Sequence, residues 1–275
     1  MRRCKLDVYL RNMGPQSTRA AILACAHAAE TAGLDALWVA DHIAIPPDDA
    51  EGSNGRYLDP LATLAFLAGA TERISLGTGV LVVPYRPALP TAKWVATIQE
   101  LSGERLWLGV GVGWMEPEFR AVGVARRDAP RVTDATLAFL VRCFAEDVVE
   151  ANGQPFLFRP RPRRPPIIVG GAPPHALRRA VRYGDGWMPM GRDPDAIRPA
   201  IEQLRELAAA AGKPAPEVVM LTSLPVDDPP AAAARARAFA DVGATRVVHG
   251  ARYADAAEFA RVADVLSTTV APALA

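Results

Sequence analysis

Apolar and polar positions along this chain follow two alternating patterns. Short apolar runs, several with a period of two, predict buried strands at residues 5–9, 34–43, 74–83, 106–112, 167–169, 186–189, 218–224 and 245–249. Segments with helical spacing and capping residues predict helices at residues 17–33, 61–71, 90–101, 132–144, 175–182, 194–211, 231–242 and 255–266. In the first of these, Ser17 is the expected N-cap and Gly33 the expected end.

Strands and helices therefore alternate eight times, which is typical of parallel strands joined by crossover helices. This number closes into a (β/α)8 barrel, a TIM barrel, and we expect residues 1–275 to form one such domain. A doubly wound open sheet is the lesser alternative. The long connection between residues 114 and 167 should hold one helix and a loop rich in proline and arginine.

Glycine occupies one face of the strand at residues 106–112 and continues just beyond it. Gly109, Gly111 and Gly113 alternate with Leu108, Val110 and Val112. A glycine face indicates that something flat or bulky approaches the backbone, or that the glycines relieve crowding inside a packed barrel. The spacing is not that of a dinucleotide-binding turn, and Pro117 follows too early for its helix.

The carboxyl ends of barrel strands are where the chemistry of such folds is found. Asp41 and His42 end the second predicted strand, and imidazole can exchange a proton near neutral pH. Such a pair is also often a simple strand cap. The turn from Gly170 to Ala172 precedes a helix and either binds a phosphate or only connects the two elements.

Composition excludes several functions. Lys plus Arg number 31 against 30 Asp plus Glu, so no net field favours nucleic acid or an anionic membrane. Three cysteines without a CxxC pair fit a reduced cytoplasm and no disulfide framework. Four scattered histidines indicate no metal site, with His27 and His175 expected on helix surfaces. No nucleophile elbow and no long apolar span occur, so neither Ser-His-Asp hydrolysis nor a membrane-spanning segment is expected.

Three segments together resemble the luciferase-like monooxygenase superfamily, most closely its branch of coenzyme F420-dependent oxidoreductases. They are GLDALWVADH, then ERISLGTGVLVVPYRPALPTAKWVATIQELSGERLWLGVGVGW, and then PPIIVGGA with ALRRAVRYGDGW. The resemblance implies a barrel that binds a deazaflavin or a flavin in its mouth, on a bulge with a non-prolyl cis peptide within residues 78–81. The cofactor-binding residues that it implies are Asp41, His42, Thr78, Gly79, Val80, Gly111, Val112, Gly113, Gly170, Gly171, Ala172, Met190 and Gly191.

The function that the resemblance implies is hydride transfer between F420 and a small organic substrate, in a homodimer. His42 would be the acid or base and Asp41 would orient it. An FMN-dependent monooxygenase and a non-catalytic flavin-binding protein are the alternatives. Two departures argue against a sugar-phosphate substrate: Trp114 stands where that branch has a catalytic carboxylate, and Pro46 where it has a tryptophan. The loop at residues 225–230 is short, so the segment 46–58 or a partner subunit could cover the pocket.

Overall fold

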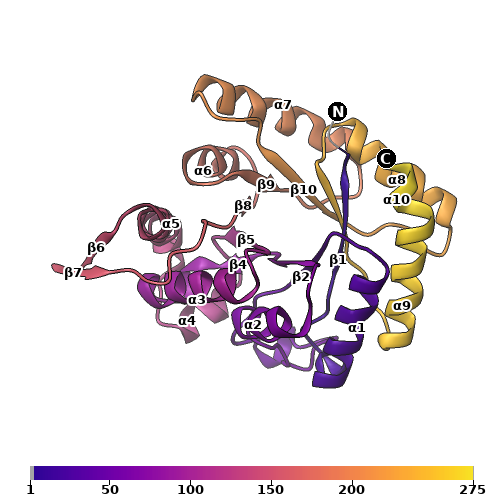
Figure 1. Ribbon diagram of the computed structural model, residues 1–275, viewed down its shortest axis with the longest axis horizontal. Coiled ribbons are helices and arrows are strands. Elements are labelled where there is room, and N and C mark those ends of the chain that lie inside the picture. Colours follow the sequence, from indigo (N-terminus) through magenta and orange to yellow (C-terminus); the bar gives the residue numbers. More distant parts are fainter. Residues whose placement is uncertain (1–2, 275) are drawn as a thin grey trace.

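The strands of the chain form a closed parallel barrel with helices on its outside (Figure 1), in a computed structural model that describes residues 3–274. Around the barrel the order is β1, β2, β3, β5, β8, β9, β10 and β11, and β11 pairs with β1 again. Their bounds are β1 Lys5–Tyr9, β2 Ala36–Val39, β3 Ser75–Thr78, β5 Leu106–Gly111, β8 Ile167–Gly170, β9 Gly186–Met188, β10 Glu217–Thr222 and β11 Arg246–His249. The TIM barrel prediction is thus confirmed, and the closure excludes an open sheet.

The helices follow the predicted order. They are α1 Arg19–Thr31, α2 Pro60–Ala70, α3 Ala88–Leu101, α4 Glu116–Ala121, α5 Ala129–Ala145, α6 His175–Tyr183, α7 Pro194–Ala210, α8 Pro229–Asp241, α9 Ala256–Val265 and α10 Ala271–Ala273. The cap predicted at Ser17 is wrong by one residue, because the Thr18 side chain accepts the hydrogen bond from the Ala21 N–H. None of the helices between residues 3 and 274 is long and apolar enough to span a membrane.

The connection from β5 to β8 holds more structure than the one helix predicted. It also contains the short helix α4 and a hairpin of β6 (Val148–Ala151) and β7 (Gln154–Leu157), which extends from the barrel beyond α5 (Figure 1). Both residues of the hairpin turn, Asn152 and Gly153, have positive φ, as an Asn-Gly turn favours. The arginines of the following loop form ion pairs: Arg159 and Arg161 with Asp147, Arg163 with Glu104 and Arg164 with Asp185.

Two tryptophans and a buried ion pair fill the barrel toward the amino ends of its strands. Asp7 is fully buried and accepts two hydrogen bonds of 2.7 Å from Arg246 and one of 2.9 Å from the Trp38 indole. The Arg246 guanidinium stacks 4.5 Å from the ring centre of Trp107. A β-carbon on Gly77 would come 2.4 Å from the Trp38 ring. On β3, position 77 is therefore a glycine because the Trp38 indole occupies the space beside it.

The third strand is interrupted at its carboxyl end. Between β3 and β4 (Leu81–Val82) the Gly79-Val80 peptide bond is cis, as predicted. The Val80 side chain lies inside the barrel mouth, where a β-carbon on Gly111 or Gly170 would approach it to 2.6 or 3.0 Å. We call the segment Gly79–Val80 the ledge. Of the two interpretations of the glycine face, the structure supports crowding by the protein's own side chains.

The ledge should be sensitive to a single methyl group on Gly111. A Gly111→Ala variant overlaps Val80, so we expect a loss of about 1–3 kcal/mol in the free energy of unfolding. Gly69→Ala is the matched control, since that exposed helical site is open and alanine favours helix by up to about 1 kcal/mol. Urea denaturation measures both. Equal stability of the two variants would contradict the packing described.

Candidate active site

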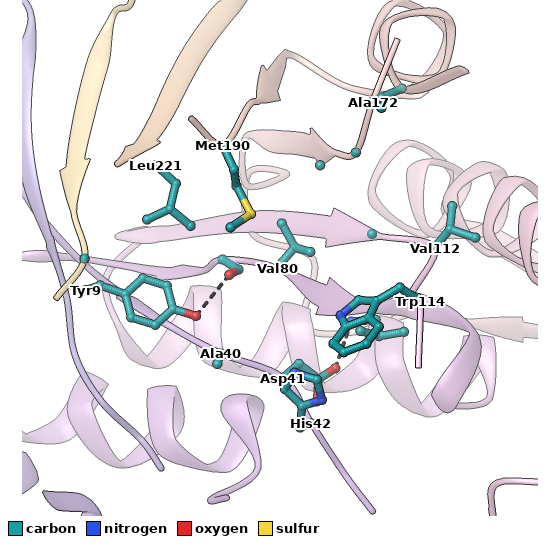
Figure 2. A pocket seen from close by; sticks show the side chains of 18 of the residues that line it. Tyr9, Ala40, Asp41, His42, Val80, Val112, Trp114, Ala172, Met190 and Leu221 are labelled. Carbon is teal, nitrogen blue, oxygen red and sulfur yellow. Dashed lines mark hydrogen bonds between the residues drawn. The ribbon is translucent and has the colours of Figure 1, made fainter. Parts of the chain in front are cut away.

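A cavity of about 1380 Å³ opens at the carboxyl ends of the strands (Figure 2). It is lined by nearly all of the site residues predicted from the sequence. These are Asp41, His42, Gly79, Val80, Gly111, Val112, Gly113, Gly170, Gly171, Ala172, Met190 and Gly191. The structure thus brings together residues that span 151 positions of the chain, from Asp41 to Gly191, counting both ends.

Two positions lie differently from what the sequence indicated. Thr78 does not line the cavity: it is fully buried, and its hydroxyl donates a 2.6 Å hydrogen bond to the Gly109 carbonyl beneath the ledge. His175, expected on a helix surface away from any site, is exposed but lies on the cavity wall at the start of α6. Periodicity alone did not show that the first turn of this helix borders the mouth.

Asp41 does not orient His42 as predicted. Its carboxylate accepts hydrogen bonds of 2.6 and 2.9 Å from Arg86 and one of 2.8 Å from the Val82 N–H, and it is only 4% exposed. Arg86 in turn contacts Asp59, the N-cap of α2. The Tyr9 hydroxyl donates to the Gly79 carbonyl at 3.0 Å from the other side (Figure 2). Asp41 therefore fixes the backbone just after the ledge, and Tyr9 holds the ledge itself.

The carboxylate that contacts His42 is Glu118 on α4. The distance from His42 Nδ1 to Glu118 Oε2 is 2.9 Å, and the carboxylate is fully buried. Glu118 Oε1 accepts hydrogen bonds from the backbone N–H groups of Ile43 and Ala44, and Oε2 accepts a third from the Tyr85 hydroxyl at 2.9 Å. Four donors therefore converge on one side chain and tie the chain after β2 to α4.

These donors keep Glu118 ionised and determine how His42 is protonated. Burial raises the pKa of Glu118, but the hydrogen bonds from His42, Ala44 and Ile43 outweigh it and lower this pKa to about 2. An ionised carboxylate only accepts hydrogen bonds, so His42 Nδ1 must carry a proton. The other ring nitrogen, Nε2, is left free of this contact, and the His42 side chain, which is 20% exposed, lines the cavity.

Glu118 was not recognised from the sequence because α4 was not predicted. The helix has six residues, too few for a helical period to be visible. Glu116 and Glu118 flank Pro117, and only the fold shows that Glu118 is buried while Glu116 is exposed. Phe119, the next residue, is fully buried. An acidic residue directly before a large apolar one was the only sequence feature that could have indicated a buried carboxylate at position 118.

Aromatic side chains flank His42. The Tyr57 ring lies 5.0 Å away and the Trp114 ring 6.1 Å away in an edge-on arrangement, between ring centres. Trp114 is 66% exposed and Met190, from the segment after β9, is 76% exposed. Two large apolar side chains thus stand at the rim of the cavity, and both are available to contact a ligand (Figure 2).

The opposite wall of the cavity suits the anionic end of a cofactor. Gly170 to Ala172 lead into α6, whose amino end favours negative charge. His175, Arg126 and Arg192 line the same cavity. The apolar ledge suits a flat ring, and this cationic wall suits a phosphate-bearing tail. Within residues 3–274, no three His, Cys, Asp or Glu side chains are grouped closely enough to hold a metal.

Comparison with known proteins gives one family for nearly the whole chain. The luciferase-like monooxygenase family profile matches residues 8–269. An uncharacterized protein of Mycobacterium tuberculosis is 31% identical over 248 residues, which cover 82% of this chain and 83% of that protein.

Two characterised proteins are also similar. An F420-dependent hydroxymycolic acid dehydrogenase of Mycobacterium tuberculosis is 32% identical over 183 residues, 62% of this chain and 49% of that protein. The solved structure of an F420-dependent secondary alcohol dehydrogenase with an F420-acetone adduct superposes with a TM-score of 0.81 at 18% identity, covering 100% of both chains. At that identity the structural likeness shows the fold alone.

Glu118 should make stability depend on pH in acid. Its pKa is about 2 in the folded chain against an ordinary value of 4.5, so its contribution is complete above about pH 4.5 and is lost as the pH falls toward 2. A Glu118→Gln variant cannot titrate there. The stability difference between wild type and variant should therefore shrink by roughly 2 kcal/mol between pH 5 and pH 3.

Urea denaturation at the two pH values measures this difference. Glu116→Gln, which removes an exposed carboxylate from the same helix, is the control for the loss of one charge. If the Glu118→Gln difference stayed constant over this range, Glu118 would not be held ionised by its four donors.

Proposed function

Because the chain belongs to the luciferase-like monooxygenase family, we propose that it is an oxidoreductase that transfers a hydride between the deazaflavin coenzyme F420 and a small organic substrate. The main support is the cavity, in which His42 stands beside an apolar ledge that can hold a flat ring. The similarity to an F420-dependent dehydrogenase over 62% of the chain favours the deazaflavin over FMN.

Backbone and apolar groups would hold the coenzyme. Gly79 and Val80 would form the floor for the ring, and the turn from Gly170 to Ala172 would bind its phosphate-bearing tail. The remaining contacts would come from Gly111, Val112, Gly113, Met190 and Gly191. A bound deazaflavin supplies a ring carbon that takes up or releases hydride without readily activating oxygen.

His42 would move the proton that accompanies the hydride. When an alcohol is oxidised, its carbon loses a hydride and its hydroxyl loses a proton; the Nε2 atom of neutral His42 can accept that proton. Glu118 stabilises the resulting imidazolium through Nδ1. In the reverse direction the same atom returns the proton to the carbonyl oxygen. Tyr57 and Trp114 restrict the ring to this orientation.

The experiment that tests the coenzyme is a titration of the apo protein with oxidised F420 and, separately, with FMN, read by fluorescence quenching. We expect tighter binding of F420. Preferential binding of FMN would move the function to an FMN-dependent monooxygenase. Binding of F420 without its reduction or oxidation in a screen of alcohols and carbonyl compounds would indicate a non-catalytic coenzyme-binding protein.

Replacing His42 separates catalysis from binding. In a His42→Ala variant we expect turnover to fall by about 100-fold or more, because proton transfer is lost, with F420 affinity within a few-fold of wild type. His27→Ala is the control, since this histidine lies on the exposed side of α1. Unchanged turnover per folded His42→Ala molecule would refute the catalytic role.

We also propose that the protein is a homodimer that pairs through α2 and α3. Phe66, Trp94 and Leu101 on these two adjacent helices are 39%, 47% and 65% exposed, so a second copy could cover apolar surface on both helices. Trp94→Glu should convert the dimer to a monomer in sedimentation at micromolar concentration. Leu157→Glu, in the exposed hairpin, should leave the dimer intact. A monomeric wild-type protein would contradict the proposal.

A further inference from the structure

Arg11, just after β1, is a buried cation on the cavity wall without a counter-charge. Its side chain lines the cavity although the residue is only 7% exposed. Its Nε has no hydrogen-bond partner, and Nη2 makes one long contact of 3.5 Å with the Gly52 carbonyl. Among residues 3–274 no carboxylate lies within 4.0 Å of this guanidinium. Buried charges are normally paired, so an anionic ligand would complete this site.

A second arginine faces the same point. Arg252, in the segment after β11, lines the cavity, and a β-carbon on Gly52 would lie 3.2 Å from its Nη2. Both guanidinium groups therefore lie near Gly52; we call Arg11 and Arg252 the arginine pair. Neither forms an ion pair within the part of the chain that the structure describes. Asp48, Asp49 and Glu51 of the neighbouring loop are exposed and form no ion pair there either.

The loop that carries Gly52 is held in place by backbone hydrogen bonds. The Gly14 N–H donates to the Arg56 carbonyl at 2.9 Å, and the Leu58 N–H donates to the Asn12 carbonyl at 2.8 Å. The Arg11 N–H also donates to the Tyr253 hydroxyl at 2.9 Å, which joins the segments after β1 and β11. The position of the arginine pair is thus determined by the fold.

The arginine pair is separate from the wall assigned to the coenzyme tail. It follows β1 and β11, whereas the turn from Gly170 to Ala172 follows β8. In the strand order β2, β3 and β5 lie between β1 and β8 on one side, and β9, β10 and β11 on the other. A coenzyme tail that runs toward α6 therefore leaves the arginine pair to the other reactant.

The arginine pair is also on the His42 side of the cavity. Met13, two residues after Arg11, forms an isolated antiparallel β-bridge with Tyr57. The Tyr57 ring lies 5.0 Å from the His42 ring, between ring centres. Among residues 3–274, Asp41 is the only carboxylate that lines this cavity, and it is paired with Arg86. The exposed carboxylates of the neighbouring loop, Asp48, Asp49 and Glu51, are not among the residues that line the cavity.

We propose that the substrate is an organic acid, bound through its carboxylate or phosphate group by Arg11 and Arg252, with its reacting carbon over the ledge beside His42. This inference rests on the proposed function for the identity of the other reactant. Paired guanidinium groups can each donate two hydrogen bonds to such an anion, which gives both affinity and orientation.

Binding of simple probes tests the proposal without turnover. Isothermal titration calorimetry would compare benzoate, phenyl phosphate and the neutral isostere benzamide, with and without bound F420. We expect at least one of the two anions to bind at least 10-fold more tightly than benzamide, and the tighter anion identifies the acidic group. Arg11→Gln and the exposed-site variant Arg252→Gln should each weaken that anion 10-fold or more and leave benzamide unchanged.

The reciprocal control is Arg192→Gln on the opposite wall, which should weaken F420 and leave the anion unchanged. Equal binding of anions and benzamide would overturn the proposal, as would a loss of F420 affinity in Arg252→Gln as large as the loss for the anion. If F420 does not bind but the anion still requires both arginines, the acidic-ligand site stands and only the proposed coenzyme fails.

Discussion

The interior of the barrel has room for only a few large side chains, and the glycines decide where they lie. Gly77 makes space for Trp38 toward the amino ends of the strands, and Gly111 and Gly170 make space for Val80 at the mouth. Because Val80 occupies that space, the chain after β3 forms a ledge inside the barrel rather than outside it. The floor of the cavity is thus part of the barrel packing, so the fold and the site are stabilised together.

Two buried carboxylates, Asp41 and Glu118, lie next to this floor. From the sequence, Asp41 alone was expected to orient His42. Asp41 pairs with Arg86 and accepts a hydrogen bond from the backbone just after the ledge. Glu118 accepts hydrogen bonds from four donors, one of which is His42, and so orients the His42 ring. The two acids differ in how their surroundings act on them: the hydrogen bonds to Glu118 outweigh burial and lower its pKa, whereas burial raises the pKa of Asp41 despite its contacts with Arg86 and Val82. Separating the two tasks lets the His42 ring be fixed from outside the cavity, with Nε2 directed to the inside.

Charge is distributed unevenly around the mouth although the whole chain is nearly neutral. Among residues 3–274, Arg126 and Arg192, and likewise Arg11 and Arg252, line the cavity without forming an ion pair. An apolar centre between two cationic ends matches two anionic reactants that meet through their uncharged parts. Inside a partly enclosed cavity such charges act more strongly than they would in bulk water.

The sequence by itself determined the strand and helix alternation, the closed barrel and almost every segment that lines the cavity. Those features depend on local periodicity, glycine spacing and the rule that parallel strands end at one face. The cis peptide at the ledge was implied by the resemblance to a known family and not by any of these patterns. Only the tertiary structure decided that Glu118 contacts His42, that Asp41 does not, that Thr78 lies below the floor and that Arg11 is buried. Each of these depends on which side chains from distant segments meet. A sequence pattern shows which face a residue occupies but not which partner lies opposite, so the polar contacts were set by packing.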